Sequence, residues 1–287
     1  MSQTDAQATV LEVDSVTVTR PPRQRPVLKD VSFRVSAGER IVVLGGNGSG
    51  KTTLVRLLNG TLLPDAGRVI VRGQATTDPT ALHEIRRCVG MLFQDPDNQF
   101  VTTTAEREIA FGLENLQRSS TEMRAIVEAA LEEFDLVRYR HTPPHEMSGG
   151  EKARLALACV WVMGAQVLIL DETESLLDRQ ACERLRARTE SLPPETIVLQ
   201  VTTEAENAHD ADRVLVLHEG RLVADGPPDA VWSHLPGEVI ECIGLPLVWR
   251  LSRQLQDEAR HSGVQLTSSW DTLLEPFRKP PTPKRQA

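Results

Sequence analysis

The stretch that decides the fold is RIVVLGGNGSGKTTLVRLLN, residues 40–59. It predicts a short apolar strand over residues 41–44, a glycine-rich turn, and a helix that starts near Lys51. The turn has the spacing G-x-x-x-x-G-K-T, the P-loop or Walker A pattern. Its glycines allow a backbone nest whose N–H groups point at one anion, and the positive end of the helix favours negative charge. We therefore predict a nucleotide-phosphate site formed by Gly45, Asn47, Gly48, Ser49, Gly50, Lys51, Thr52 and Thr53.

Two side chains of this turn have separate predicted tasks. Lys51 is long enough to reach the β- and γ-phosphates, and the Thr52 hydroxyl is suited to a Mg²⁺ ion. The alternative is a glycine turn that merely joins a strand to a helix. Phosphate binding is favoured because the complete pattern lies between an apolar strand and a helix, where its mechanism requires it.

Composition restricts the class of protein. The formal net charge of −8 and the pI near 5.5 argue against a nucleic-acid partner attracted by the overall field. The longest apolar stretch, residues 155–170, is too short to cross a bilayer and is interrupted by Gly164 and Gln166. The first ten residues are polar and do not resemble a signal peptide. We expect a soluble cytoplasmic protein with reduced cysteines at Cys88, Cys159, Cys182 and Cys242.

The order of the predicted elements indicates an α/β fold. Residues 10–35 alternate in hydropathy around a proline-rich turn, which predicts two antiparallel strands. Strands and helices then alternate, which indicates a mostly parallel sheet. Between residues 95 and 161 the pattern is helical only, with helices predicted at 105–115, 121–139 and 148–163.

Acidic and amide side chains follow two of the predicted strands. The apolar residues 167–170 end at Asp171 and Glu172, the Walker B pattern. In this pattern Asp171 would hold Mg²⁺ and Glu172 would orient and polarise water. Gln94 follows the strand predicted at 88–93, where its amide could reach Mg²⁺ or the attacking water. The alternatives are acidic residues that only cap a strand and a surface glutamine.

A second anion site is predicted at the start of the last insert helix. Ser148, Gly149 and Gly150 stand at a helix N-terminus, and Glu151 follows Ser148 at the spacing of a capping box. A plain helix cap is the alternative interpretation.

In this order the motifs closely resemble the nucleotide-binding subunit of ABC transporters, over roughly residues 10–228. In that family two subunits sandwich two ATP molecules, and each site joins the Walker motifs of one subunit to the Ser-Gly-Gly signature of the other. The resemblance therefore implies ATP and Mg²⁺ as ligands and a second ATPase subunit as partner, either a second copy or, preferably, an unlike chain.

A narrower resemblance lies in FQDPDNQFVTTTAEREIAFGLEN, residues 93–115. This run looks like the ATPase of energy-coupling-factor (ECF) importers, which take up vitamins and transition-metal ions. It implies an ECF transmembrane coupling subunit and a substrate-binding membrane subunit as partners, at the cytoplasmic face of the membrane. The C-terminal part, with Gly-Leu-Pro at 244–246, is also similar to that group, where it helps the ATPases to dimerise. Packing of its apolar face on the chain's own core is the alternative for Val248, Leu251, Leu255 and Ala259.

The resemblance implies a P-loop NTPase (RecA-like) core with an antiparallel β subdomain, an all-helical insert and a small C-terminal helical extension. The expected boundaries are an ABC ATPase domain over 8–228 (core 8–93 and 161–228, helical subdomain 94–160), an extension over 229–275, and a disordered tail over 276–287.

The sequence departs from the family pattern at several positions. Arg20 stands where an aromatic residue normally stacks on adenine, and an arginine plane can also stack on a base. Thr203 stands where a histidine normally reaches toward the γ-phosphate. Losing such a polar contact to a transition state costs on the order of 10²–10³ in rate. Two further departures are Glu174 and Arg179, whereas Ser148 to Gly150 is intact.

These departures lead to the hypothesis that the chain's own Walker site binds Mg-ATP but turns it over slowly. A largely non-hydrolysing regulatory subunit is an alternative. Another is a soluble ABC ATPase that acts on DNA or ribosomes. That class has a long coiled-coil insert or two tandem ATPase halves, but residues 94–160 are too short for the former and the chain has one P-loop.

Overall fold

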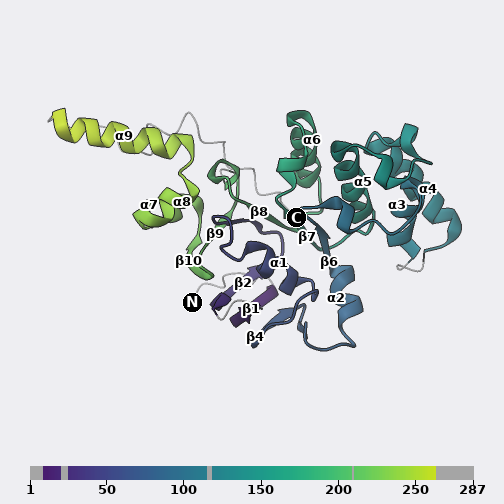
Figure 1. Cartoon of the computed structure of the whole chain (residues 1–287), viewed down its shortest axis with the longest axis horizontal. Coiled ribbons are helices and arrows are strands. Elements are labelled where there is room, and N and C mark those ends of the chain that lie inside the picture. Colours follow the sequence, from purple (N-terminus) through teal and green to yellow (C-terminus); the bar gives the residue numbers. More distant parts are fainter. Residues whose placement is uncertain (1–8, 21–24, 115–117, 209, 263–287) are drawn as a thin grey trace, which may run out of the picture.

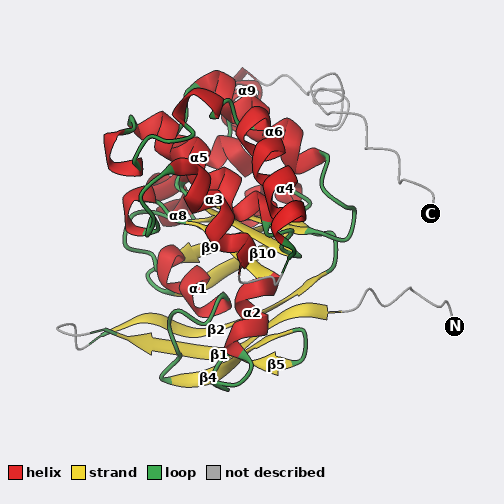
Figure 2. Ribbon diagram, turned by 90° about the vertical axis from the view of Figure 1, so that its right-hand side faces the viewer, coloured by secondary structure: helices red, strands yellow, loops and turns green. Residues whose placement is uncertain are grey.

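Two β-sheets face each other across helix α1 (Lys51–Leu58) in the computed structural model, which describes residues 9–20, 25–114, 118–208 and 210–262. The smaller sheet is antiparallel, with the order β2-β1-β4-β5 (Figure 2). Its strands alternate in burial because one face covers α1 and the other is exposed. They are β1 (Thr9–Thr19), β2 (Pro26–Ser36), β4 (Ala66–Val71) and β5 (Gln74–Ala75).

The larger sheet has six strands in the order β10-β9-β3-β8-β7-β6 (Figure 1). Its first five strands along the chain are parallel, and β10 returns antiparallel to β9 as a hairpin. Parallel strands covered on both faces are apolar throughout, and every residue of β7 is buried. The strands are β3 (Arg40–Leu44), β6 (Val89–Leu92), β7 (Val167–Asp171), β8 (Ile197–Thr202), β9 (Arg213–His218) and β10 (Arg221–Gly226).

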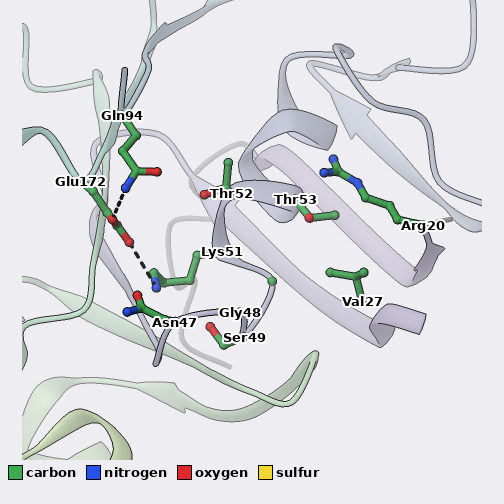
Figure 3. A pocket seen from close by; sticks show the side chains of 11 residues that line it. Arg20, Val27, Asn47, Gly48, Ser49, Lys51, Thr52, Thr53, Gln94 and Glu172 are labelled. Carbon is green, nitrogen blue, oxygen red and sulfur yellow. Dashed lines mark hydrogen bonds and ion pairs between the residues drawn. The ribbon is translucent and has the colours of Figure 1, made fainter. Parts of the chain in front are cut away.

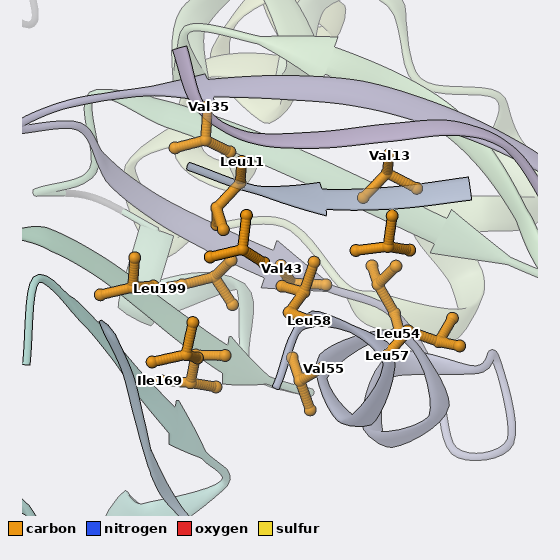
Figure 4. Close-up of a cluster of buried hydrophobic side chains, with 14 of the residues drawn as sticks. Leu11, Val13, Val35, Val43, Leu54, Val55, Leu57, Leu58, Ile169 and Leu199 are labelled. Atoms are coloured by element: carbon orange, nitrogen blue, oxygen red, sulfur yellow. The ribbon is translucent and has the colours of Figure 1, made fainter. Parts of the chain in front are cut away.

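Helix α1 is buried over most of its circumference because it lies between the two sheets. Leu54, Val55, Leu57 and Leu58 are all fully buried in the main core. Figure 4 shows these side chains between Leu11, Val13 and Val35 of the small sheet and Val43, Ile169 and Leu199 of the large one. The helix that follows the P-loop is thus held by both sheets.

The helical insert, defined as α3 (Ala105–Glu114), α4 (Ser120–Glu133) and α5 (Gly149–Val162), has its own core. Leu168 and Leu170 of β7 join this core from the sheet. The predicted helix at 121–139 was too long. Helix α4 ends at Glu133 because Asp135 adopts a left-handed conformation with φ of 55°, and a separate 3₁₀ turn follows at Val137–Tyr139. Two further helices, α2 (Leu82–Cys88) and α6 (Arg179–Glu190), flank the large sheet.

The C-terminal extension, defined as α7 (Pro228–His234), α8 (Gly237–Ile243) and α9 (Leu247–Ser262), forms a third core with β3 and β9. Helix α9 projects from the body at the end opposite the helical insert (Figure 1). Of the predicted apolar face, Val248 is half-buried and Leu251 is 49% exposed. The side chains of Leu255 and Ala259, residues 263–275 and the predicted tail at 276–287 lie outside the described part of the chain.

None of the helices in the described ranges combines the length and the apolar character that a bilayer crossing requires.

The extension should contribute a large share of stability through Trp232, whose side chain is only 1% exposed in the third core. Truncation of a buried tryptophan costs about 3–5 kcal/mol because it removes apolar burial and leaves a cavity. We expect Trp232→Ala to lower the free energy of unfolding by that amount in urea titrations. Trp249→Ala is the matched control, since Trp249 is only partly buried and should lose clearly less. Equal losses of unfolding free energy in the two variants would contradict the conclusion that Trp232 is a main contributor to the stability of the third core.

Candidate nucleotide-binding site

The parallel strands bring the predicted motifs together at their carboxyl ends. Leu44, just before the P-loop, pairs with Thr202 of β8, and Asp171 pairs with Val201 of the same strand. At the other side of β7, Leu170 pairs with Leu92, two residues before Gln94. Ligands of open α/β sheets bind at this edge. The strand register therefore places the P-loop, the Walker B pair, Gln94 and Thr203 at one edge of the sheet.

A cavity of about 400 Å³ lies over the P-loop (Figure 3). Most of its wall comes from the P-loop and the first turn of α1, and Gln94 and Glu172 close one side. The small sheet supplies the other side through Arg20, which follows β1, and Val27 of β2. Its lining residues are Arg20, Val27, Asn47, Gly48, Ser49, Gly50, Lys51, Thr52, Thr53, Gln94 and Glu172. Gly45 lies just before this wall, and Val27 was not predicted, because in sequence it is only one more apolar strand residue.

The P-loop requires glycine for two different reasons. Gly48 and Gly50 have φ of 77° and 108°, the left-handed region that glycine tolerates, and Gly50 caps the N-terminus of α1. Gly45 instead has no space for a side chain. A Cβ there would lie 2.4 Å from the Leu217 carbonyl oxygen and 2.5 Å from the Ser49 Oγ. The backbone of the turn therefore lies directly against the end of β9, which leaves no room for a side chain at Gly45.

Lys51 is 5% exposed and its ammonium group is held by three oxygens. Its Nζ donates to the carbonyl oxygens of Gly45 at 2.8 Å and Gly46 at 3.3 Å. It also lies 3.4 Å from the Glu172 Oε1 (Figure 3). These contacts direct the charge into the cavity, where a phosphate group would meet it.

Glu172 is held over the cavity from both sides, in a strained conformation. Its Oε2 accepts a hydrogen bond of 2.8 Å from the Gln94 Nε2, while Oε1 faces Lys51. Its backbone is left-handed, with φ of 53° and ψ of 31°. Its N–H donates to the Val201 carbonyl at 3.0 Å and its own carbonyl accepts from the Ser175 Oγ at 2.7 Å. Strain of this kind persists where the surroundings fix it and is concentrated at functional sites.

Asp171 lies beneath the cavity with its carboxylate buried and without a partner. The residue is 1% exposed, and neither carboxylate oxygen has a hydrogen-bond partner. Burial raises the pKa of this carboxyl, the charge of Glu172 adds to the effect, and the Thr52 hydroxyl with the cations of Lys51 and Arg56 opposes it. A buried carboxylate without a partner, beside a threonine hydroxyl, suits a hard cation such as Mg²⁺. The residues present therefore fit the predicted metal site of Thr52, Gln94 and Asp171.

The Ser-Gly-Gly segment does not contribute to this cavity. Ser148 is the N-cap of α5, and its N–H donates to the Glu151 Oε2 at 2.8 Å, as the predicted capping box requires. The Tyr139 hydroxyl donates to the other oxygen of Glu151. A Cβ on Gly149 or on Gly150 would meet nothing within 4 Å. Packing within this chain therefore does not explain why either position is glycine.

Thr203 lies one residue beyond β8 but does not line the cavity. The turn there is fixed by its neighbour, because the Thr202 Oγ1 accepts hydrogen bonds from the Glu204 N–H at 3.0 Å and the Asn207 Nδ2 at 3.1 Å. The two other unusual residues differ in exposure. Burial raises the pKa of the half-buried Glu174 carboxyl, whereas the Arg179 side chain is 93% exposed at the start of α6.

Together the P-loop cavity, the acidic pair at the end of β7 and the separate signature helix define a P-loop ATPase domain with a helical insert. A sequence profile of the ABC transporter family matches residues 28–175. An energy-coupling factor transporter ATP-binding protein of Enterococcus faecium is 37% identical over 92% of this chain and 94% of its own length. One from Bacillus licheniformis is 40% identical over 84% and 85%.

The fold agrees with these comparisons. The structure of CbiO1 from Clostridium perfringens, described as part of an ABC transporter complex, superposes with a TM-score of 0.68 at 30% identity, over 86% of this chain and 99% of that one. The chain belongs to the ABC transporter family, as an ATP-binding subunit, and it is an ATPase. The predicted fold class is confirmed.

The unpartnered carboxylate predicts opposite effects of Asp171→Asn on stability and on metal binding. A raised pKa means that the folded protein loses stability as the pH rises from the ordinary carboxyl range through that raised pKa, because burial disfavours the ionised form. Without ligand we expect Asp171→Asn to raise the free energy of unfolding by about 1 kcal/mol. The same variant should lose the Mg²⁺-dependent part of its nucleotide affinity. Thermal melts with ATP, with and without Mg²⁺, measure both, and a destabilised variant would contradict the argument.

Proposed function

We propose that this chain is the ATP-hydrolysing subunit of an ECF-type importer, which energises uptake of a vitamin or a transition-metal ion. The single observation that carries the proposal is the likeness to energy-coupling factor ATP-binding proteins over nine-tenths of both chains. The run at residues 93–115 and the C-terminal extension agree with it. The chain would act at the cytoplasmic face of the membrane, against a coupling subunit and a substrate-binding membrane subunit, and not on nucleic acid.

Dimerisation is supported by the separation of the two anion sites. Ser148, Gly149 and Gly150 stand outside the wall of the chain's own cavity. The open space around both glycines leaves room for a phosphate that arrives from outside the chain. A second ATPase subunit, placed head to tail, would bring its own triphosphate to this helix and complete two composite sites.

Within one site, most of these residues would bind the nucleotide or the metal ion, and Glu172 would act on the attacking water. The P-loop N–H groups and Lys51 would bind the β- and γ-phosphates, and Arg20 with Val27 would cover the base. Thr52, Asp171 and Gln94 would hold Mg²⁺, which supplies positive charge against the phosphate oxygens when bound. Glu172, fixed by Gln94 at 2.8 Å, would orient the attacking water and accept its proton.

Turnover at this site is proposed to be slow because Thr203 stands at the position of the switch histidine. A threonine side chain is shorter than histidine and carries no positive charge. The intact Ser148 to Gly150 segment would then serve a second, unlike ATPase subunit. A mostly regulatory ATP-binding subunit is the second candidate, favoured because Thr203 does not reach the cavity wall. No observation favours action on DNA or ribosomes.

Thr203→His tests the slow site directly. Restoring a polar contact to the transition state should raise ATP turnover of the assembled ATPase pair about 10- to 100-fold. Steady-state phosphate release measures it, and Thr203→Asn, which supplies a longer polar side chain without positive charge, is the control with a smaller gain. No increase with histidine would remove Thr203 as the cause of slow turnover.

Substitution of the proposed general base, Glu172, tests whether the two sites of the pair hydrolyse ATP at different rates. In the assembled pair, Glu172→Gln should leave most of the ATP turnover intact, whereas the equivalent change in the partner should abolish it. If Glu172→Gln alone stops all turnover, the unequal division between the two sites is wrong.

The glycines of the Ser-Gly-Gly signature predict a variant that is more stable than the wild-type chain but less active in the pair. Alanine is a better helix former than glycine, and a methyl group on Gly149 meets no atom within 4 Å. Gly149→Ala should therefore raise the free energy of unfolding by roughly 0.5 kcal/mol, leave ATP affinity of the isolated chain unchanged, and lower turnover of the pair. Denaturant titration, nucleotide binding and phosphate release give the three values. Normal turnover would exclude close contact of this helix with a second nucleotide.

A further inference from the structure

The C-terminal extension packs against the strand that leads into the P-loop. Its core combines Leu44 of β3 and Val216 of β9 with Val239 and Ile243 of α8, all nearly or fully buried. Leu44 is the last residue before Gly45. The apolar surface that supports the extension therefore ends where the phosphate-binding turn begins.

Helix α8 also reaches the P-loop itself. A Cβ built on Gly46 would lie 3.9 Å from the Cβ of Cys242, the nearest atom outside the adjoining residues. The carbonyl of Gly46 accepts one of the hydrogen bonds of the Lys51 Nζ, at 3.3 Å. The space between α8 and this backbone accepts a methyl group and little more. A displacement of Gly46 would move an oxygen that holds the phosphate-binding lysine.

A second contact joins the extension to the segment that follows Thr203. The 3₁₀ turn Ala205–Ala208 begins two residues after that threonine. The Oε1 of Glu206, in this turn, accepts a hydrogen bond of 2.7 Å from the Leu247 N–H and lies 3.9 Å from the Nη2 of Arg250. The first turn of α9 is thus tied to the end of β8. The extension therefore packs beside the P-loop and is tied to the turn that follows Thr203.

We infer that the C-terminal extension positions the P-loop, with Cys242 as the residue of α8 that lies next to Gly46. Phosphate binding requires the N–H groups of the P-loop to converge and Lys51 to keep its direction. A displacement of α8 toward Gly46 would disturb both, so the placement of α8 and nucleotide affinity depend on each other. Such coupling is reciprocal in binding free energy. The inference rests on nucleotide binding at the P-loop and goes beyond it, because it assigns this binding a dependence on the extension.

Alkylation of Cys242 tests this dependence in the full-length chain. Cys242 is exposed, whereas Cys88 is buried and Cys159 and Cys182 are partly covered, so N-ethylmaleimide should react at Cys242 first. The adduct adds bulk to α8 at the residue that lies next to Gly46. We expect MgATP affinity, measured by titration with a fluorescent ATP analogue, to fall at least tenfold. The thermal midpoint without nucleotide should change little, which separates a shifted P-loop from a damaged fold.

Two variants control for the reagent and for the bulk of the adduct. The reagent should leave the nucleotide affinity of Cys242→Ser as it was before treatment. Adding Glu241→Cys to that variant puts the same adduct one position away, on an exposed residue of α8, and should leave affinity within twofold. Unchanged affinity after alkylation of Cys242, or equal losses at positions 241 and 242, would overturn the inference. If the untreated chain binds no MgATP, nucleotide binding itself fails and the inference falls with it.

Discussion

The close approach of the P-loop to the end of β9 is the constraint on which the site depends. Gly45 has no room for a side chain beside the Leu217 carbonyl oxygen. The Gly220 N–H donates to the Ser49 carbonyl at 3.1 Å, and the Gly220 carbonyl accepts from the Lys29 N–H at 2.8 Å. Three segments far apart in the sequence thus meet at the N-terminus of α1. Because that N-terminus carries the unsatisfied N–H groups, their direction is set by the tertiary fold.

The neighbouring acidic residues of β7 illustrate how the site is kept ready at a cost in stability. Asp171 is buried without a hydrogen bond, and Glu172 has a left-handed backbone that non-glycine residues avoid. Both features are unfavourable in the ligand-free chain. Both lie where a cation or a water molecule would use them, and both are held by strand pairing with β8. The core of valine, leucine and isoleucine around α1 offsets such local costs.

The sequence correctly predicted those features that depend only on residues close together in the chain. The apolar run and glycine spacing predicted β3, the P-loop and the start of α1, and the spacing of Ser148 and Glu151 predicted the cap of α5. The end of α4 was missed because it depends on the left-handed Asp135. Val27 was missed because the cavity wall arises only when the small sheet approaches the P-loop. The domain boundaries and the roles of Arg20 and Thr203 stay predictions, since they depend on bound nucleotide or on partner chains.

The signature helix supports the proposal that one copy of this chain carries parts of two composite sites. Gly149 and Gly150 weaken the first turn of α5, and nothing in the described part of the chain uses the space they leave. Meanwhile the cavity over the P-loop has one side lined by Gln94 and Glu172 and another by Arg20 and Val27, with no residue from α5. A folded chain that keeps an unused helix N-terminus and an incomplete cavity is best explained by association. Under the proposed dimer, catalytic competence would be a property of the interface, because the residues that set it would be divided between two subunits.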